Sequence, residues 1–375
     1  MKHVAFLHDH VLGAGGAENH ILSLIRCLRG ELRFSLIART TPQFRARAEE
    51  LGARVFDQPA HRPLSPLWVA GLVRTIRAER IDLLHPQGAI AATPGRIAAR
   101  LAGIPALVTF HFPASRYHGT RRTARALLGR ALYVAVDRWL NHLLPWPLIY
   151  VSRTYRTEEV RAGRAPDNRA VFIPNGVDLS AYAPPLEPRA NPLLTVLFVG
   201  RLAAQKGGDV LLNALEMLPP GLPPWECLIA GEGPLRAELE AQARGMSASV
   251  RPRVRFLGFR ADVNRLLAVA DVFVLPSRSE AASIALIEAM ATGLPCVVTA
   301  VGDSAEMVLG GAGGPAGAAV GPDDAAALAR ELARLLADEP LRRRMSAAAR
   351  QAARLYDERE TARRVLEIYH ALLEL

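Results

Sequence analysis

The chain has 375 residues, half of them hydrophobic, and a formal net charge of +10 at neutral pH. This length is long for a single hydrophobic core and suits two domains of ordinary size. No apolar run approaches the roughly 20 residues that a membrane-spanning helix needs, and the charged start MKHVAFLHDH lacks the apolar stretch of a signal peptide. We therefore expect a soluble, cytoplasmic protein.

The positive charge is concentrated in the first half of the sequence. Residues 1–185 carry 25 basic and 13 acidic side chains, whereas residues 186–375 carry 21 and 23, so an acidic partner would face the first half. Because the basic residues are mostly scattered arginines without a nucleic-acid-binding motif, we expect no nucleic-acid partner. The three cysteines lie far apart in the sequence, each within an apolar segment (Cys27, Cys227 and Cys296). We therefore expect reduced, buried thiols.

Short apolar runs alternate with longer amphipathic segments along the chain. The runs are VAFLH, FSLIA, DLLH, PALVTFH, LIYVS and AVFIP in the first half, and TVLFVG, ECLIAG, RVRFLG, DVFVLP and PCVVTA in the second. Strands that are apolar on both faces and separated by helices predict an α/β fold with parallel sheets. Four prolines within residues 183–192 would stop a helix or a strand, so we place the interdomain linker there.

Each half opens with an apolar strand, a glycine-bearing loop and an amphipathic helix, which predicts two doubly wound domains facing a central cleft. In the first loop, Gly15 and Gly16 would let backbone N–H groups at a helix start approach an anion. The dinucleotide pattern G-x-G-x-x-G is not completed, because Glu18 stands in place of its third glycine. A nicotinamide-cofactor enzyme is therefore disfavoured.

The loop that opens the second half carries two cations. Arg201 follows TVLFVG directly, and Lys206 comes five residues later, ahead of a glycine pair. Two cations at the carboxyl end of a parallel strand, beside a helix start, suit a diphosphate. The alternative is a pair of solvated cations on a surface turn.

Two carboxylates stand eight positions apart in SEAASIALIEAMATG, residues 279–293. Glu280 would lie in the loop after the strand DVFVLP, and Glu288 two turns into a helix over 283–291. Ionised carboxylates accept hydrogen bonds from the vicinal hydroxyls of a sugar or ribose. Alternatively, the helix dipole favours Glu280 and a neighbouring arginine binds Glu288. Because no D-x-D motif appears, we expect no metal ion.

Four segments resemble the signatures of retaining glycosyltransferase family 4, namely VGRLAAQKG, ADVFVLPSRSEAASIALIEAMATGLPCVV, AVGDSAEMV and IPNGVDLSAY. The resemblance implies the GT-B fold, with two Rossmann-like domains. Residues 1–185 would bind the acceptor, residues 186–354 would bind the donor, and a closing helix over 355–375 would pack back on the first domain.

The activity that the resemblance implies is retaining, hexosyltransferase-type transfer from a UDP- or GDP-sugar. The acceptor would be a hydroxyl of a glycan or lipid-linked molecule in cell-surface polysaccharide or glycolipid biosynthesis, and no metal or other cofactor would be required. Arg201 and Lys206 match the pair that holds the donor diphosphate. Glu280 matches the glutamate that approaches the transferred sugar, and Glu288 the one that accepts from the ribose.

Further positions are carried over from the same resemblance. Gly15 and Gly16 match a turn that closes over the diphosphate, and His111 matches a histidine near the donor sugar, although a strand-end histidine is often structural. Donor contacts are also expected from the loop and helix start after Glu280 and from the segment LGFRADV (Ala281, Ala282, Ser283, Ile284 and Phe259). Family members commonly have glycine after the first glutamate, so its replacement by alanine makes the donor uncertain.

The acceptor side is marked by residues 116–138, which hold six arginines against one aspartate. Such a basic, partly amphipathic stretch suits peripheral contact with an anionic membrane on the inner face of the cell, and a solvated helix is the alternative. Three other functions stay open. They are a GT-B nucleotide-sugar epimerase, a phosphorylase, for which no pyridoxal lysine is evident, and a non-catalytic nucleotide-sugar-binding subunit.

Overall fold

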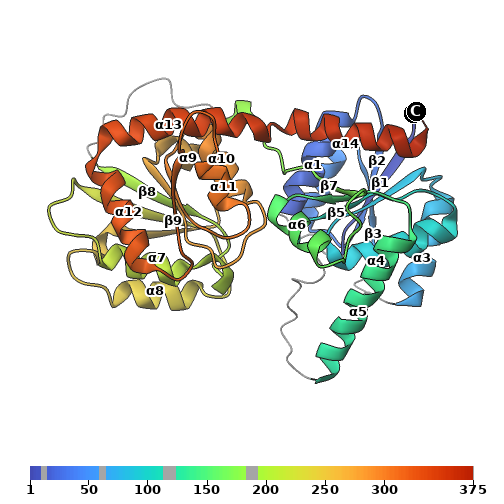
Figure 1. Ribbon diagram of the computed structural model, residues 1–375, viewed down its shortest axis with the longest axis horizontal. Helices are drawn as coiled ribbons and strands as arrows, with labels where there is room; N and C mark the ends of the chain where they lie inside the picture. Colours follow the sequence, from blue (N-terminus) through green and yellow to red (C-terminus); the bar gives the residue numbers. More distant parts are fainter. Residues whose placement is uncertain (10–14, 59–64, 113–123, 183–192, 375) are drawn as a thin grey trace. The chain divides into compact units, whose positions relative to one another are not determined.

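The structure is a computed structural model. It describes residues 1–9, 15–58, 65–112, 124–182 and 193–374, without the side chains of 124–127 and 130. The chain forms two compact units, which we call unit 1 (Met1–Gly176 with Glu358–Leu375) and unit 2 (Val177–Asp357). Both are α/β units, as the strand pattern predicts (Figure 1).

Unit 1 is built on parallel strands. One sheet has the order β3-β2-β1-β4 and a second has the order β5-β6-β7, and isolated bridges join Leu84 to Ala106 and Gln87 to Thr109 between them. The strands are β1 (His3–Leu7), β2 (Arg33–Ala38), β3 (Arg54–Asp57), β4 (Leu83–Pro86), β5 (Val108–Phe110), β6 (Leu148–Tyr150) and β7 (Ala170–Phe172).

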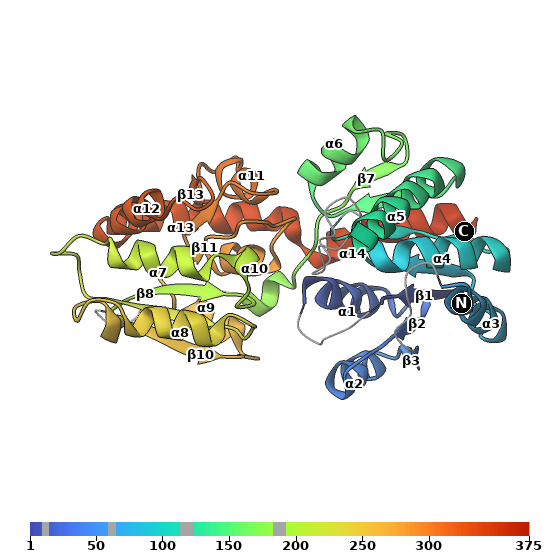
Figure 2. The same cartoon turned by 90° about the horizontal axis from the view of Figure 1, so that it is seen from below.

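The helices of unit 1 pack around these strands, as Figure 2 shows. They are α1 (Gly16–Leu28), α2 (Pro42–Glu50), α3 (Pro66–Ala78), α4 (Ala89–Ala102), α5 (Ala124–Leu143), α6 (Arg153–Arg161) and α14 (Glu358–Leu373). The last of them, α14, packs on α1, where the Glu358 carboxylate accepts a hydrogen bond of 2.7 Å from the Ser23 hydroxyl and one of 3.1 Å from Arg26 Nε. The closing helix thus belongs to unit 1.

Unit 2 contains one parallel sheet of order β10-β9-β8-β11-β12-β13. This order, in which the chain leaves from the middle of the sheet in both directions, is that of a doubly wound domain. The strands are β8 (Leu194–Val199), β9 (Trp225–Ala230), β10 (Val254–Gly258), β11 (Val272–Leu275), β12 (Cys296–Thr299) and β13 (Gly317–Val320). Loops that follow β8 and β11 therefore meet at the carboxyl edge of the sheet.

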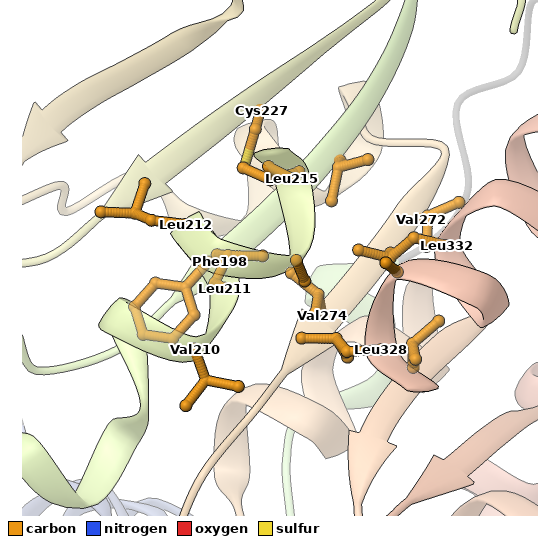
Figure 3. Close-up of a cluster of buried hydrophobic side chains, with 14 of the residues drawn as sticks. Phe198, Val210, Leu211, Leu212, Leu215, Cys227, Val272, Val274, Leu328 and Leu332 are labelled. Atoms are coloured by element: carbon orange, nitrogen blue, oxygen red, sulfur yellow. The ribbon is translucent and has the colours of Figure 1, made fainter. Parts of the chain in front are cut away.

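Helices and short 3-10 turns complete unit 2. The helices are α7 (Gly208–Glu216), α8 (Arg236–Arg244), α9 (Val263–Val269), α10 (Ile284–Thr292), α11 (Ser304–Leu309), α12 (Ala325–Ala337) and α13 (Glu339–Ala353). The turns are η2 (Leu179–Tyr182), η3 (Ala204–Lys206), η4 (Arg251–Arg253) and η5 (Arg354–Tyr356). Figure 3 shows the core that fixes α7 and α12 on the sheet, in which Phe198, Leu211 and Leu332 are buried among aliphatic side chains.

The division into units differs from the expected boundaries at 185/186 and 354/355. The 3-10 turn η2 lies in unit 2 because Leu179 and Tyr182 pack on its buried cluster. Similarly, η5 stays in unit 2, where the Tyr356 carbonyl accepts a hydrogen bond of 2.9 Å from the backbone of Val177. Residues 183–192, where the linker is expected, lie outside the described residues.

Candidate functional site

The carboxyl edge of the unit 2 sheet brings the loops after β8 and β11 together. Gly207, which ends η3, has a φ of +65°, and a Cβ at this position would overlap the carbonyl oxygen of Pro276 at the end of β11. Only glycine tolerates both the left-handed backbone and this close approach. The chain thereby places Lys206 against the segment that contains Glu280.

Lys206 and Glu280 form an ion pair at this edge, with Nζ donating to Oε1. The Ser277 hydroxyl donates a second hydrogen bond, of 2.8 Å, to the same oxygen. The pair is shielded from solvent, since only 17% of the Lys206 side chain and 7% of the Glu280 side chain are exposed. The structure therefore joins two of the predicted site residues directly.

Arg201 follows β8 as expected, but it does not join this pair. Its side chain is exposed, and within the described ranges no ion pair involves its guanidinium group. A solvent-facing guanidinium group remains available to an anionic ligand. Its proposed role on the donor diphosphate stays a prediction.

The segment that follows Glu280 is buried, and alanine fits its backbone. Ala281 and Ala282 are 5% and 8% exposed, and neither has a positive φ. Replacement of the family's glycine therefore imposes no backbone strain here. The segment is held in place by Gly302 (φ +55°), where a Cβ would overlap the carbonyl oxygens of Glu280 and Ala281.

The helix α10 begins at Ile284, directly after buried Ser283, and has no acidic residue in its first turn. The positive end of α10 thus follows directly on the loop that contains Glu280. Phe259 follows β10 and is 62% exposed, so the structure leaves its predicted donor contact without further support.

Glu288 lies within α10, and its partner is neither Glu280 nor an arginine. Its carboxylate accepts a hydrogen bond of 2.6 Å from the Tyr182 hydroxyl. Burial raises the pKa of Glu288 to about 7, although the Tyr182 hydrogen bond opposes the rise. Glu288 is thus a partly buried hydrogen-bonding group whose charge changes near neutral pH.

The predicted residues of unit 1 occupy a histidine-rich region. His111, which follows β5, has its Nε2 3.0 Å from the Gln87 side-chain oxygen, and its ring packs edge-on against His20 at 5.3 Å. Burial lowers the pKa of His111 well below its ordinary value and that of His20 to about 4. These imidazoles are therefore neutral at pH 7.

The predicted glycine turn lies at the start of α1. Gly15 caps this helix and Gly16 is its first residue, as the sequence indicates. However, the Glu18 carboxylate folds back over Gly15, into the space that a Cβ would occupy. An acidic side chain thus already approaches the positive end of this helix.

Two further observations concern metals and membranes. In the part of the chain that the structure describes, no three histidine, cysteine, aspartate or glutamate side chains are grouped so that they could hold a metal ion. Over the same residues, no helix combines the length and apolar character needed to span a bilayer. That the site works without a metal or other cofactor stays a prediction, and residues 116–123 of the basic stretch lie outside the described ranges.

Two doubly wound units, one with a shielded cation–carboxylate pair at the carboxyl edge of its sheet, define the class of Rossmann-like α/β proteins. A family model described as Glycosyltransferase Family 4 matches residues 14–181, and one described as Glycosyl transferases group 1 matches residues 187–352. The two matches together span nearly the whole chain. The protein belongs to the family 4 type of glycosyltransferases, which confirms the resemblance seen in the motifs.

Relatives agree with this assignment, and a solved structure matches the fold. A phosphatidyl-myo-inositol mannosyltransferase of Mycobacterium leprae (strain TN) is 29% identical over 373 residues, 96% of this chain and 93% of the relative. A UDP-Gal:alpha-D-GlcNAc-diphosphoundecaprenol alpha-1,3-galactosyltransferase of Escherichia coli is 29% identical over 241 residues, 61% of this chain and 60% of that protein. Anabaena HepE, solved in complex with UDP and glucose, matches with a TM-score of 0.82 and 23% identity over 99% of this chain and 100% of its own. The fold is GT-B, as expected.

Several residues at these sites were not predicted from the sequence. Ser277 and Arg278 lie in SRSEAAS, and Tyr182 ends IPNGVDLSAY, but no spacing rule links them to Lys206 or Glu288. Gln87 directly follows β4. A polar side chain at the carboxyl end of a buried parallel strand is a typical site residue, so this position could have been predicted.

Proposed function

We propose that the protein is a retaining, hexosyltransferase-type glycosyltransferase that uses a nucleotide-diphosphate sugar, a UDP- or GDP-sugar, as its donor. The observation that carries the proposal is the Lys206–Glu280 ion pair at the carboxyl edge of the unit 2 sheet. A diphosphate that enters the site would attract the Lys206 ammonium group more strongly than the single carboxylate of Glu280 does. When Lys206 turns to the diphosphate, the Glu280 carboxylate becomes free to accept a hydrogen bond from a sugar hydroxyl.

In this proposal, Lys206 moves from Glu280 to the diphosphate, and exposed Arg201 adds a second cation. Negative charge develops on the diphosphate as the glycosidic bond breaks, and both cations, together with the positive end of α10, stabilise it. Glu280 then accepts a hydrogen bond from the transferred sugar. A phosphate oxygen of the donor takes the proton of the acceptor hydroxyl as the new bond forms on the same face.

In this proposal Glu280 is not the nucleophile. Retaining glycosidases place two carboxyl groups on either side of the bond that breaks, whereas the Glu280 carboxylate already binds Lys206 and Ser277. Glu288 has a separate role, in which its carboxylate accepts hydrogen bonds from the ribose and gives up the Tyr182 hydroxyl. In unit 1, the donor roles of His111, Gly15 and Gly16 stay predictions.

For the acceptor, we propose a hydroxyl of a lipid-linked molecule or glycan in cell-surface biosynthesis, at the inner face of the membrane. The support is α5, whose amino-terminal end extends away from the strands of unit 1 (Figure 1). Four large apolar residues of α5 are each more than half exposed (Leu128, Leu132, Trp139 and Leu143). At 100° per residue they lie within an arc of about 60°, and we call them the α5 stripe.

The inner side of α5 is fixed by polar contacts, so the stripe cannot turn inward. Buried Arg96 on α4 forms an ion pair with Asp137 and a hydrogen bond with Asn141. Asp137 is the one acidic residue in the sequence of α5, and it is buried. The outward side is therefore apolar along the α5 stripe, and exposed Arg138 stands next to Trp139 in the sequence, a combination that suits an anionic bilayer surface.

The names of two relatives also support a lipid-linked acceptor, since one name contains phosphatidyl-myo-inositol and the other diphosphoundecaprenol. The experiment that tests the proposed function is a thermal-shift panel of UDP-, GDP- and ADP-sugars, followed by transfer to lipid-linked acceptors with the product anomer read by NMR. We expect one nucleotide class to stabilise wild type and to serve as donor with retention. Stabilisation by no donor in the panel would contradict the proposal.

A further inference from the structure

Arg278 links three segments of the chain at the carboxyl edge of the unit 2 sheet. Its guanidinium group forms two hydrogen bonds with the Asp209 carboxylate, of 2.9 and 2.6 Å. Nε donates to Asp323 at 2.6 Å, and Nη1 also donates to the carbonyl oxygen of Ala204 at 2.8 Å. We call Arg278 and these three partners the Arg278 network.

The members of the Arg278 network come from segments that lie far apart in the sequence, with Ala204 in η3 and Asp209 at the start of α7. Ala204 and Asp209 flank Lys206 after β8, Arg278 stands two residues before Glu280 after β11, and Asp323 follows β13. The backbone reinforces the first link, because the Arg278 N–H donates to the carbonyl oxygen of Gln205 at 2.8 Å. The network therefore joins the segment that contains Lys206 to the segment that contains Glu280.

The geometry of this network requires a guanidinium group. A planar fork with several N–H donors can bind one carboxylate with two bonds and reach two further acceptors, which a lysine ammonium cannot do in the same plane. Asp323 also has a φ of +60°, a left-handed conformation that aspartate adopts more readily than most non-glycine residues. Hydrogen bonding by Arg278 lowers the pKa of Asp209.

We propose that Arg278 is a positioning residue for donor binding, which acts by holding the Lys206 loop at a fixed distance from the Glu280 loop. The inference rests on the proposed function, because Lys206 is assigned there to the donor diphosphate. Arg278 itself is engaged by Asp209, Asp323 and Ala204. Its effect on the donor is therefore indirect and passes through Lys206.

The test compares Arg278→Gln with wild type and with Arg334→Gln as the matched control. Arg334 also lies in unit 2 and binds a glutamate, Glu331, but both residues are on α12, away from the two loops. Calorimetry with the stabilising nucleotide-diphosphate sugar should show about a tenfold higher Kd for Arg278→Gln and no change for the control. The KM for the acceptor should stay at the wild-type value, which general loss of structure would not allow.

A double-mutant cycle with Lys206→Gln identifies the route of the effect. If Arg278 acts through Lys206, Arg278→Gln should not weaken donor binding further in the Lys206→Gln background. Asp323→Asn, which removes one partner of the network at a largely exposed position, gives a second variant if Arg278→Gln folds poorly. It should raise the donor Kd in the same direction by a smaller factor.

The chain contains only two lysines, Lys2 and Lys206, so reductive ¹³C-methylation yields few NMR signals. The Lys206 signal should shift in ligand-free Arg278→Gln and not in Arg334→Gln. An unchanged donor Kd and Lys206 signal in Arg278→Gln would overturn the positioning role while leaving the proposed function intact. Absence of donor binding by wild type would instead overturn the proposed function, and the positioning role with it.

Discussion

Lys206 and Glu280, 74 positions apart in the sequence, form a shielded ion pair at the carboxyl edge of the unit 2 sheet. Because the Glu280 side chain is nearly buried, Lys206→Met would leave a carboxylate without its cation. We expect the free energy of unfolding to fall by roughly 2–4 kcal/mol, measured by urea denaturation of the ligand-free protein.

The Glu280→Gln background provides the control for this prediction. There the buried group is neutral, so Lys206→Met should cost much less stability than in wild type. Equal losses in the two backgrounds would show that the side chains are not coupled in solution.

Glu288→Gln should stabilise the ligand-free protein in a pH-dependent way. The pKa of Glu288 is about 7 in the folded chain and has an ordinary value of 4.5, so the folded state binds the proton more tightly than the unfolded state. Wild type therefore loses stability as pH rises from about 4.5 to 7, because the unfolded chain releases a proton that folded Glu288 keeps. Glutamine carries no charge, so Glu288→Gln should gain melting temperature over wild type at pH 8 and little at pH 4.5.

Donor binding should show the opposite preference at this position. An ionised Glu288 accepts from ribose hydroxyls, so wild-type affinity for the nucleotide-diphosphate sugar should decline as pH falls below about 7. Glu288→Gln should bind more weakly and show no such decline. A wild-type affinity that is flat from pH 6 to 8 would argue against a ribose contact by the carboxylate.

The sequence predicts most of the fold because its central strands are apolar on both faces. Two strands were missed, and both lie at sheet edges. Residues 54–57 of β3 are only partly buried and include charged ends, and β13 consists of the short, weakly apolar segment GAAV. β3 is therefore too exposed, and β13 too short and too rich in small side chains, to give the apolar run that marks the other strands.

The candidate site was predicted less evenly. Lys206 and Glu280 could be placed together because parallel neighbouring strands deliver their loops to one edge. The hydrogen bond from Tyr182 to Glu288 joins residues 106 positions apart, and it depends on how η2 packs against α10. Such tertiary contacts leave no spacing pattern in the sequence, which is also why Arg278 was missed.

Ala281→Gly should destabilise the protein by about 0.5–1 kcal/mol. The backbone at Ala281 has no positive φ, so glycine gains nothing there and increases the conformational entropy of the unfolded chain. Chemical denaturation measures the loss, and Gly302→Ala is the contrasting variant, because its Cβ would overlap two carbonyl oxygens. A stabilising Ala281→Gly would show that the loop prefers the family's glycine.

The α5 stripe should bind anionic membranes. We expect wild type to sediment with liposomes that contain phosphatidylglycerol, and Leu132→Asp with Trp139→Asp to reduce the bound fraction severalfold through loss of apolar burial. Met217→Asp is the control, because Met217 is 56% exposed but ends α7 in unit 2. Equal sedimentation of all three proteins, or none at low salt, would exclude the stripe as a membrane contact.

The most direct test of the account is a calorimetric titration of wild type and Lys206→Met with the donor that stabilises the protein best in the thermal-shift panel. Loss of a cation that binds a diphosphate removes charge-assisted hydrogen bonds, which contribute about 1.5–3 kcal/mol each. The account predicts that Lys206→Met raises the donor Kd at least tenfold while its fold is retained. A donor Kd equal to that of wild type would contradict it.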